Sequence, residues 1–95
     1  MILRILRLST GEDIVGDIID NNDESVTIEN PCILVITSNR EQEQSLNMSP
    51  YLLFSNQKVL TINKKFIMFD VSVANEIQSK YNEIYAPEEF TIRKN

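Results

Sequence analysis

The alternation of apolar and polar residues predicts β-strands over the first two thirds of the chain. Residues 1–8 are apolar apart from two arginines, and the polar run at 9–13 is typical of a tight turn. In residues 14–19 successive side chains alternate between two faces, so this segment is predicted to form a hairpin with the first. A second polar turn at 20–24 leads into an alternating segment at 26–29, which we interpret as a third strand.

The strand pattern continues beyond this point with one interruption. Pro31 separates residues 26–29 from an apolar run at 32–37, which indicates a bend or bulge in a strongly curved sheet. Residues 38–45 contain no apolar side chain and are predicted to form an exposed hairpin tip. Further strands are predicted at residues 51–54, 59–62 and 66–69, with residues 55–58 either a turn or an irregularity within a strand.

The hydrophobic period then changes from two residues to about 3.6, which predicts a helix. Its apolar stripe comprises Val73, Ile77, Tyr81, Ile84 and Tyr85. Ser72 is a plausible N-cap, and Pro87 lies beyond the expected end. The stripe must cover either the open end of its own barrel or a neighbouring subunit, and its own barrel is favoured.

Five short, bent strands favour a small closed or nearly closed barrel, because curling the sheet removes exposed edges. We therefore predict a mainly β fold, an SH3-like, five-stranded, strongly bent barrel with one C-terminal amphipathic helix. Residues 1–85 form this one domain, and residues 86–95 form a polar tail that orders only against a neighbour.

Composition and charge narrow the possible functions. The net charge of −5 disfavours diffuse electrostatic binding to nucleic acid, and the absence of histidine excludes histidine-based catalysis and metal binding. The single Cys32 cannot form an intramolecular disulfide, and no leader peptide is recognisable, so we expect a cytoplasmic protein. Cys32 itself is predicted to be a small buried hydrophobe. The apolar runs are too short to cross a membrane.

Residues 6–20, with glycines at Gly11 and Gly16, resemble the first motif of the Sm and Sm-like (LSm) RNA-binding proteins. Residues 62–67 look like a degenerate second motif, with Asn63 and Lys64 where that motif has arginine and glycine. The resemblance implies a homo-oligomeric ring of about five to seven subunits. In such a ring, an edge strand at residues 51–54 would pair with residues 66–69 of the next subunit. Such a compact, divergent domain would suit a bacterial or phage genome.

The resemblance also implies that the turns facing a central pore bind RNA or single-stranded DNA. The candidate residues are Asn21, Asn22, Asp23, Asn63, Lys64 and Lys65. Repeated lysines would concentrate positive potential in the pore, and amide side chains can form hydrogen bonds with base edges. The alternative is that both segments are ordinary solvated turns.

Two other functional classes compete with nucleic-acid binding. The acidic charge favours a protein-binding scaffold that uses its acidic face or its strand edges. Catalysis would require converging carboxylates, but the acidic residues between Glu12 and Glu24 fall on turns or on the outward face of a strand. We therefore predict a protein that is not an enzyme and that uses no cofactor or metal. For Gly16, in the middle of a strand, a structural role in bending the sheet is favoured over contact with a ligand.

Overall fold

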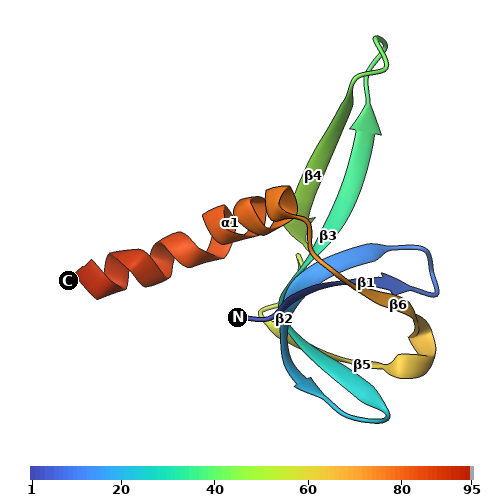
Figure 1. Ribbon diagram of the computed structural model, residues 1–95, viewed down its shortest axis with the longest axis vertical. Helices are drawn as coiled ribbons and strands as arrows, with labels where there is room; N and C mark the ends of the chain where they lie inside the picture. The colour runs from blue at the N-terminus through green and yellow to red at the C-terminus, as the bar shows by residue number, and fades with distance from the viewer. Residues whose placement is uncertain (95) are drawn as a thin grey trace.

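The computed structural model describes residues 1–94, with side chains as far as Tyr85, and it is an antiparallel sheet with one C-terminal helix (Figure 1). The strands are β1 (Leu3–Leu8), β2 (Asp13–Asn21), β3 (Ser25–Ser38), β4 (Gln44–Pro50), β5 (Val59–Asn63) and β6 (Ile67–Ser72). A short 3₁₀ turn, η1 (Lys64–Phe66), joins β5 to β6, and the helix α1 spans Asn75–Lys94. The predicted hairpin of the first two strands is confirmed.

The mainly β fold with a C-terminal helix is confirmed, but the predicted five-stranded, closed or nearly closed barrel is wrong, because the sheet has six strands and does not close into a barrel. Its hydrogen-bonded order through residues 1–94 is β4-β3-β2-β1-β6, and β5 pairs with β3 off this path. On one edge of β3, the N-terminal half pairs with β5 and the C-terminal half with β4, while β2 pairs along the other edge. The chain turns sharply at η1, which directs β6 to β1 while β5 stays on β3. The curved sheet is therefore left open between these two strands.

The bend predicted at Pro31 is confirmed by the backbone around it. Asn30 has a positive φ of 50°, and its N–H donates to the Lys58 carbonyl at 2.7 Å. The register against β2 shifts between Val15 and Asp17, as expected for a bulge. Beyond the bend, β3 and β4 leave the body of the domain as a two-stranded ribbon, whose tip carries the exposed residues 39–43 (Figure 1).

The strand predicted at residues 51–54 is wrong, because these residues form turns. The strand lies just before them, in the mostly polar β4, which pairs along the second half of β3. The chain must then return past the bend to pair β5 with the first half of β3, and residues 51–58 make this connection. The Tyr51 N–H donates to the Pro31 carbonyl at 2.8 Å, whereas Leu53 and Phe54 are 62% and 100% exposed.

The sheet has a hydrophobic cluster on each face, because neighbouring strand residues point to opposite sides. Inside the curve lie Leu6, Leu8, Ile14, Val26 and Ile28, all buried. On the other face α1 covers Val15 and Cys32, and Tyr81 of α1 is buried with them. The helix therefore packs on its own chain, as predicted, although it covers the outer face of the sheet rather than an open end. The prediction that Cys32 is a buried hydrophobe is also confirmed.

The helix α1 differs from the prediction at both ends. Ser72 is the last residue of β6 rather than an N-cap, and α1 begins at Asn75. At its other end the helix continues through Pro87 to Lys94, so the backbone of residues 86–94 belongs to it rather than to a separate tail. A proline removes one backbone donor and can kink a helix without ending it. The side chains of residues 86–95 lie outside the described part of the structure.

We expect one ion pair of the first hairpin to make the free energy of unfolding depend on pH in the acid range. Across β1 and β2, the Arg7 Nε and Nη2 atoms donate to the two carboxylate oxygens of Asp13 at 2.6 and 2.7 Å. The Arg7 hydrogen bonds lower the pKa of Asp13 below its usual value. This stabilisation is therefore present above about pH 4, the unfolded-state pKa, and is lost as the pH falls through the lowered pKa. Urea unfolding should show wild type more stable than Asp13→Asn at pH 7, with a difference that shrinks towards pH 2. A difference that does not change with pH would contradict this role.

Candidate nucleic-acid interface

The six candidate residues lie on two turns that the fold places side by side at one end of the sheet. Asn21 ends β2, and Asn22 and Asp23 form the turn that follows. Asn63 ends β5, and both lysines belong to η1. The Lys64 N–H donates to the Glu24 carbonyl at 2.8 Å, which joins the two turns directly. All six candidate residues are exposed.

Two of the candidate asparagines use their side-chain oxygens to hold these turns in shape. The Asn22 Oδ1 atom accepts hydrogen bonds from the N–H groups of Glu24 and Ser25, each at 2.9 Å. The Asn63 Oδ1 atom accepts from the Lys65 N–H at 3.0 Å and so caps η1. Both are local turn interactions typical of asparagine. Their carbonyl oxygens are therefore engaged within the protein, which leaves Asn21 as the amide best placed to meet a ligand.

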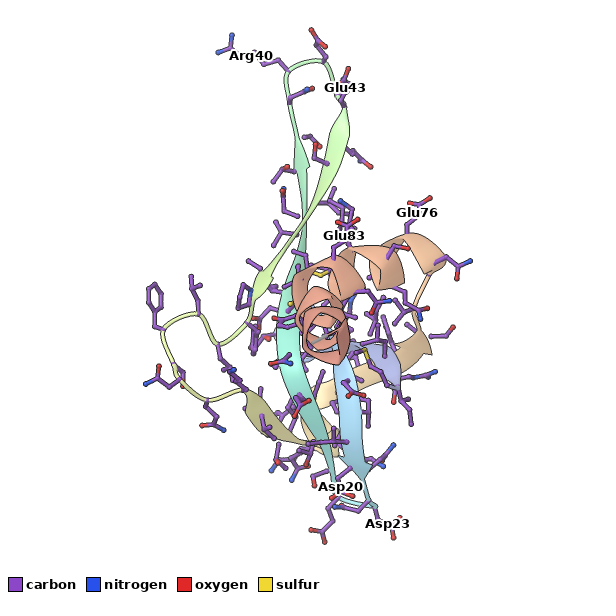
Figure 2. All side chains as sticks on the ribbon, turned by 90° about the vertical axis from the view of Figure 1, so that its left-hand side faces the viewer. Asp20, Asp23, Arg40, Glu43, Glu76 and Glu83 are labelled. Carbon is purple, nitrogen blue, oxygen red and sulfur yellow. The ribbon has the colours of Figure 1, made fainter. Side chains whose placement is uncertain are left out.

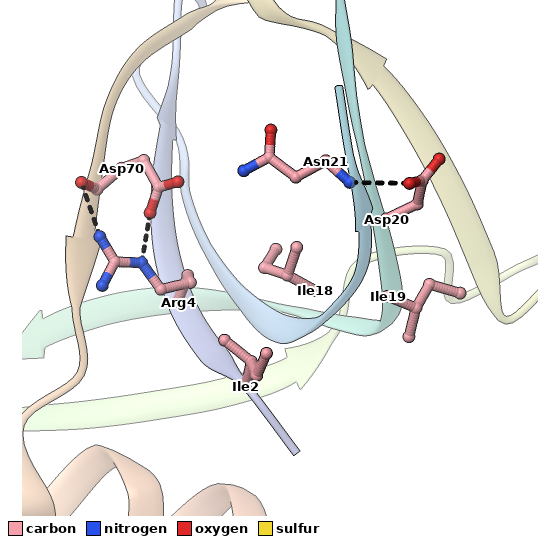
Figure 3. Close-up of a pocket in the computed structure, with 7 residues that line it drawn as sticks. All are labelled: Ile2, Arg4, Ile18, Ile19, Asp20, Asn21 and Asp70. Atoms are coloured by element: carbon pink, nitrogen blue, oxygen red, sulfur yellow. Dashed lines mark hydrogen bonds and ion pairs between the residues drawn. The ribbon is translucent and has the colours of Figure 1, made fainter. Parts of the chain in front are cut away.

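Asn21 reaches into a cavity of about 560 Å³ between the ends of β1, β2 and β6. The cavity is lined by Ile2, Arg4, Ile18, Ile19, Asp20, Asn21 and Asp70. Figure 3 shows the Asn21 side chain pointing across the open space towards Arg4 and Asp70, above Ile18 and Ile2. Asp20 projects from the opposite side of β2, where its Oδ1 accepts from the Asn21 N–H at 3.0 Å (Figure 3).

The wall opposite Asn21 is an ion pair between neighbouring strands. The Arg4 Nε atom donates to the Asp70 Oδ1 atom at 2.5 Å, and its Nη2 atom donates to the Asp70 backbone carbonyl at 3.1 Å. Each side chain remains about one third exposed, at 34%. The pair therefore presents both guanidinium donors and carboxylate acceptors to the cavity.

A second, smaller cavity of about 270 Å³ adjoins the first and brings a lysine and an aromatic ring to the site. It shares Asn21 and Asp70 with the first cavity and is further lined by Val26, Lys64, Ile67 and Phe69. The Arg7 guanidinium lies 5.0 Å from the centre of the Phe69 ring, within cation–π range. Lys65 lies instead over Phe66, at 5.1 Å from its ring centre. We call the two cavities together the Asn21–Asp70 hollow.

Arg4, Phe69 and Asp70 are among the residues of this hollow that sequence reasoning missed. Phe69 and Asp70 were assigned only to an edge strand or its end, and Arg4 only to the first strand. The pairing of β1 with β6, in which Leu6 lies opposite Asp70, brings them together. The sequence contains only a weak signal of this ion pair. Arg4 and Asp70 are charged residues within mostly apolar strands, and opposite charges on neighbouring strands stabilise a sheet when they lie across from each other.

The acidic residues are distributed over several parts of the molecule. Figure 2 shows Asp20 and Asp23 at the β2–β3 turn, Glu43 near the tip of the β3–β4 ribbon, and Glu76 and Glu83 on α1. This arrangement does not gather the negative charge on one face. Near the hollow the acidic side chains alternate with lysine and arginine, so binding there would depend on individual contacts rather than on a uniform potential.

Within the described residues, no group of acidic, cysteine or histidine side chains could hold a metal ion. No helix in the described part of the chain is long and apolar enough to cross a membrane. No protein-family model matches the sequence, and no curated protein matches it. The resemblance to the Sm-like family therefore stays a prediction.

Proposed function

We propose that the protein binds RNA or single-stranded DNA as a homo-oligomeric, Sm-like ring and catalyses no reaction. The observation that carries this proposal is the position of Lys64 and Asn21, which come from turns far apart in sequence and line one cavity. A lysine side chain can bind a backbone phosphate, and an amide can form hydrogen bonds with a base edge. Phe69 in the same cavity adds the aromatic surface on which single-stranded bases stack.

The open sheet supports the assembly part of the proposal. Its terminal strands are β4 and β6, and each can pair on its outer side with another chain. On β6, Met68, Phe69 and Val71 are 63%, 45% and 42% exposed, so association would remove apolar surface from water. Since residues 51–54 are turns, β4 takes the edge role that the resemblance implied for them. Such head-to-tail contacts form a ring when the rotation from one subunit to the next closes.

Replacing both lysines of η1 is expected to weaken binding and its dependence on salt. Light scattering gives the solution mass, and fluorescence anisotropy with labelled oligo-U and oligo-A gives the affinity. For Lys64→Ala/Lys65→Ala we expect about a tenfold loss at low salt. The slope of log affinity against log salt should become shallower by about 1.4, from two lost contacts at about 0.7 each.

A matched control separates this effect from the change in net charge. Arg40 lies at the ribbon tip and Lys80 on α1, and both are exposed. The variant Arg40→Ala/Lys80→Ala also removes two positive charges and should retain binding. A monomeric protein that binds neither oligonucleotide would refute the ring and the nucleic-acid site together.

A protein-binding scaffold is the second candidate, favoured by one specific observation. The connection between β4 and β5 exposes Leu53 and Phe54 to solvent, and the chain as a whole is acidic. Exposed aromatic and aliphatic side chains are common at protein interfaces. Binding to a protein partner through this segment should survive Lys64→Ala/Lys65→Ala and should be lost in Leu53→Ser/Phe54→Ser.

A further inference from the structure

We propose that the Asn21–Asp70 hollow selects a guanine base and discriminates against uracil. This inference rests on the proposed nucleic-acid function and specifies its ligand. Asp70 is the carboxylate that faces Asn21 across the larger cavity (Figure 3). None of the residues lining the hollow other than Asn21 and Lys64 belongs to the candidate set derived from the sequence.

Asp70 retains capacity to accept hydrogen bonds from a base. Its Oδ1 atom accepts from the Arg4 Nε atom, and its backbone carbonyl accepts from the Arg4 Nη2 atom. An ionised carboxylate offers about four lone-pair positions on two oxygens, so one bond from Arg4 leaves most of them free. Arg4 also holds the carboxylate in one orientation, so less side-chain freedom remains to be lost on binding.

The hydrogen-bonding edge of guanine complements this carboxylate. Guanine presents two adjacent donors, the N1–H and the 2-amino group, which can meet the two oxygens of one carboxylate. Uracil presents a single N–H between two carbonyl oxygens, and those oxygens would face the negative charge of Asp70. Adenine and cytosine each present an amino group beside an acceptor nitrogen. The expected order of affinity is therefore guanine first, adenine and cytosine next, and uracil last.

The remaining walls fit the rest of a guanine nucleotide. Ile2 and Ile18 provide an apolar floor, and the volume of about 560 Å³ lies in the usual range of small-molecule sites, roughly 300–1,000 Å³. The Asn21 amide opposite Asp70 can donate to the guanine O6 atom. In the adjoining cavity Lys64 can contact a phosphate, and Phe69 can pack against the neighbouring base.

Anisotropy titrations at low salt with three labelled RNAs of equal length test the inference. One RNA repeats U-G, the second repeats U-inosine, and the third is oligo-U. Inosine lacks only the 2-amino group of guanine, so it removes one of the two donors to Asp70. We expect U-G to bind about tenfold more tightly than oligo-U, with U-inosine between them, as for one well-placed bidentate contact.

Two variants with the same change in charge identify Asp70 as the selecting residue. Asp70→Asn replaces one acceptor by a donor and should reduce the preference for U-G over oligo-U to less than twofold. Glu76→Gln removes the same charge on α1, and Glu76 lines neither cavity of the hollow, so the preference should remain (Figure 2). Circular dichroism checks that both variants fold, and the inosine comparison needs no variant.

The outcomes separate this inference from the proposed function. If wild type binds oligo-U as tightly as U-G, the guanine preference is wrong and the nucleic-acid function stands. If no RNA binds, the proposed function fails and the inference fails with it. If Asp70→Asn keeps the full preference for U-G, Asp70 is not the selecting residue and the inference is overturned.

Discussion

Replacing Tyr81 by alanine is expected to lower the free energy of unfolding by about 3–5 kcal/mol, the range for large aromatic-to-alanine changes in a core. Tyr81 is only 1% exposed, and its ring centre lies 4.7 Å from that of Tyr85. Its hydroxyl donates to the carbonyls of Glu29 and Asn30 at 3.2 and 3.1 Å. Tyr81 thus joins α1 to the bend in β3, so its loss removes both packing and the hydrogen bonds to these two carbonyl groups.

Urea unfolding of Tyr81→Ala, Tyr81→Phe and Ile84→Ala measures these contributions separately. Burial raises the pKa of Tyr81 above its usual value, so the hydroxyl stays a donor throughout the ordinary pH range. Tyr81→Phe keeps the ring and should lose about 1 kcal/mol for the hydrogen bonds. Ile84 is 44% exposed on the same helix, and its truncation should have a much smaller effect than that of Tyr81. A loss below 1 kcal/mol for Tyr81→Ala would mean that α1 does not stabilise the sheet.

The second large effect is expected at Gly16, where alanine should lower stability by about 1–3 kcal/mol through overpacking. An added Cβ atom would lie 2.5 Å from Ile28 Cγ1, 2.7 Å from Ile28 Cδ1 and 3.0 Å from the Glu29 carbonyl oxygen. Ile28 is fully buried, so it cannot move away without disturbing the core inside the curved sheet. Gly16 therefore permits β2 to approach β3 closely, a structural role of the kind that the sequence predicted.

A double-mutant cycle tests whether this contact is the cause. Ile28→Ala is itself destabilising, but it removes both carbon atoms that an added Cβ would meet. In that background Gly16→Ala should lower the free energy of unfolding by less than it does in wild type, with a coupling of at least about 0.5 kcal/mol. Strictly additive effects would contradict a clash with Ile28. The free energies come from urea unfolding of the four proteins.

The candidate site could be predicted only in part. The polar turns containing Asn21 and Lys64 were found from residue types alone, because such residues favour turns wherever the chain reverses. Arg4 and Asp70 were not found, since each belongs to a mostly apolar strand and becomes part of a candidate site only through its ion pair with the other. Their contact depends on β1 pairing with β6, which is a long-range pairing that local patterns do not encode.

The sequence by itself determined the first hairpin, the buried faces of its strands, and the stripe by which the helix packs. Ile14 and Val15 on opposite faces of β2, and Val73, Ile77 and Tyr81 on one side of the C-terminal segment, follow from side-chain periods of two and about 3.6 residues. Tertiary structure alone decided that the polar β4 is a strand while the apolar residues 51–54 are turns, and that the sheet stays open. The physical reason is that the spacing of apolar residues indicates which side chains are buried. The choice of a strand's partner depends instead on hydrogen bonds and packing summed over the whole chain.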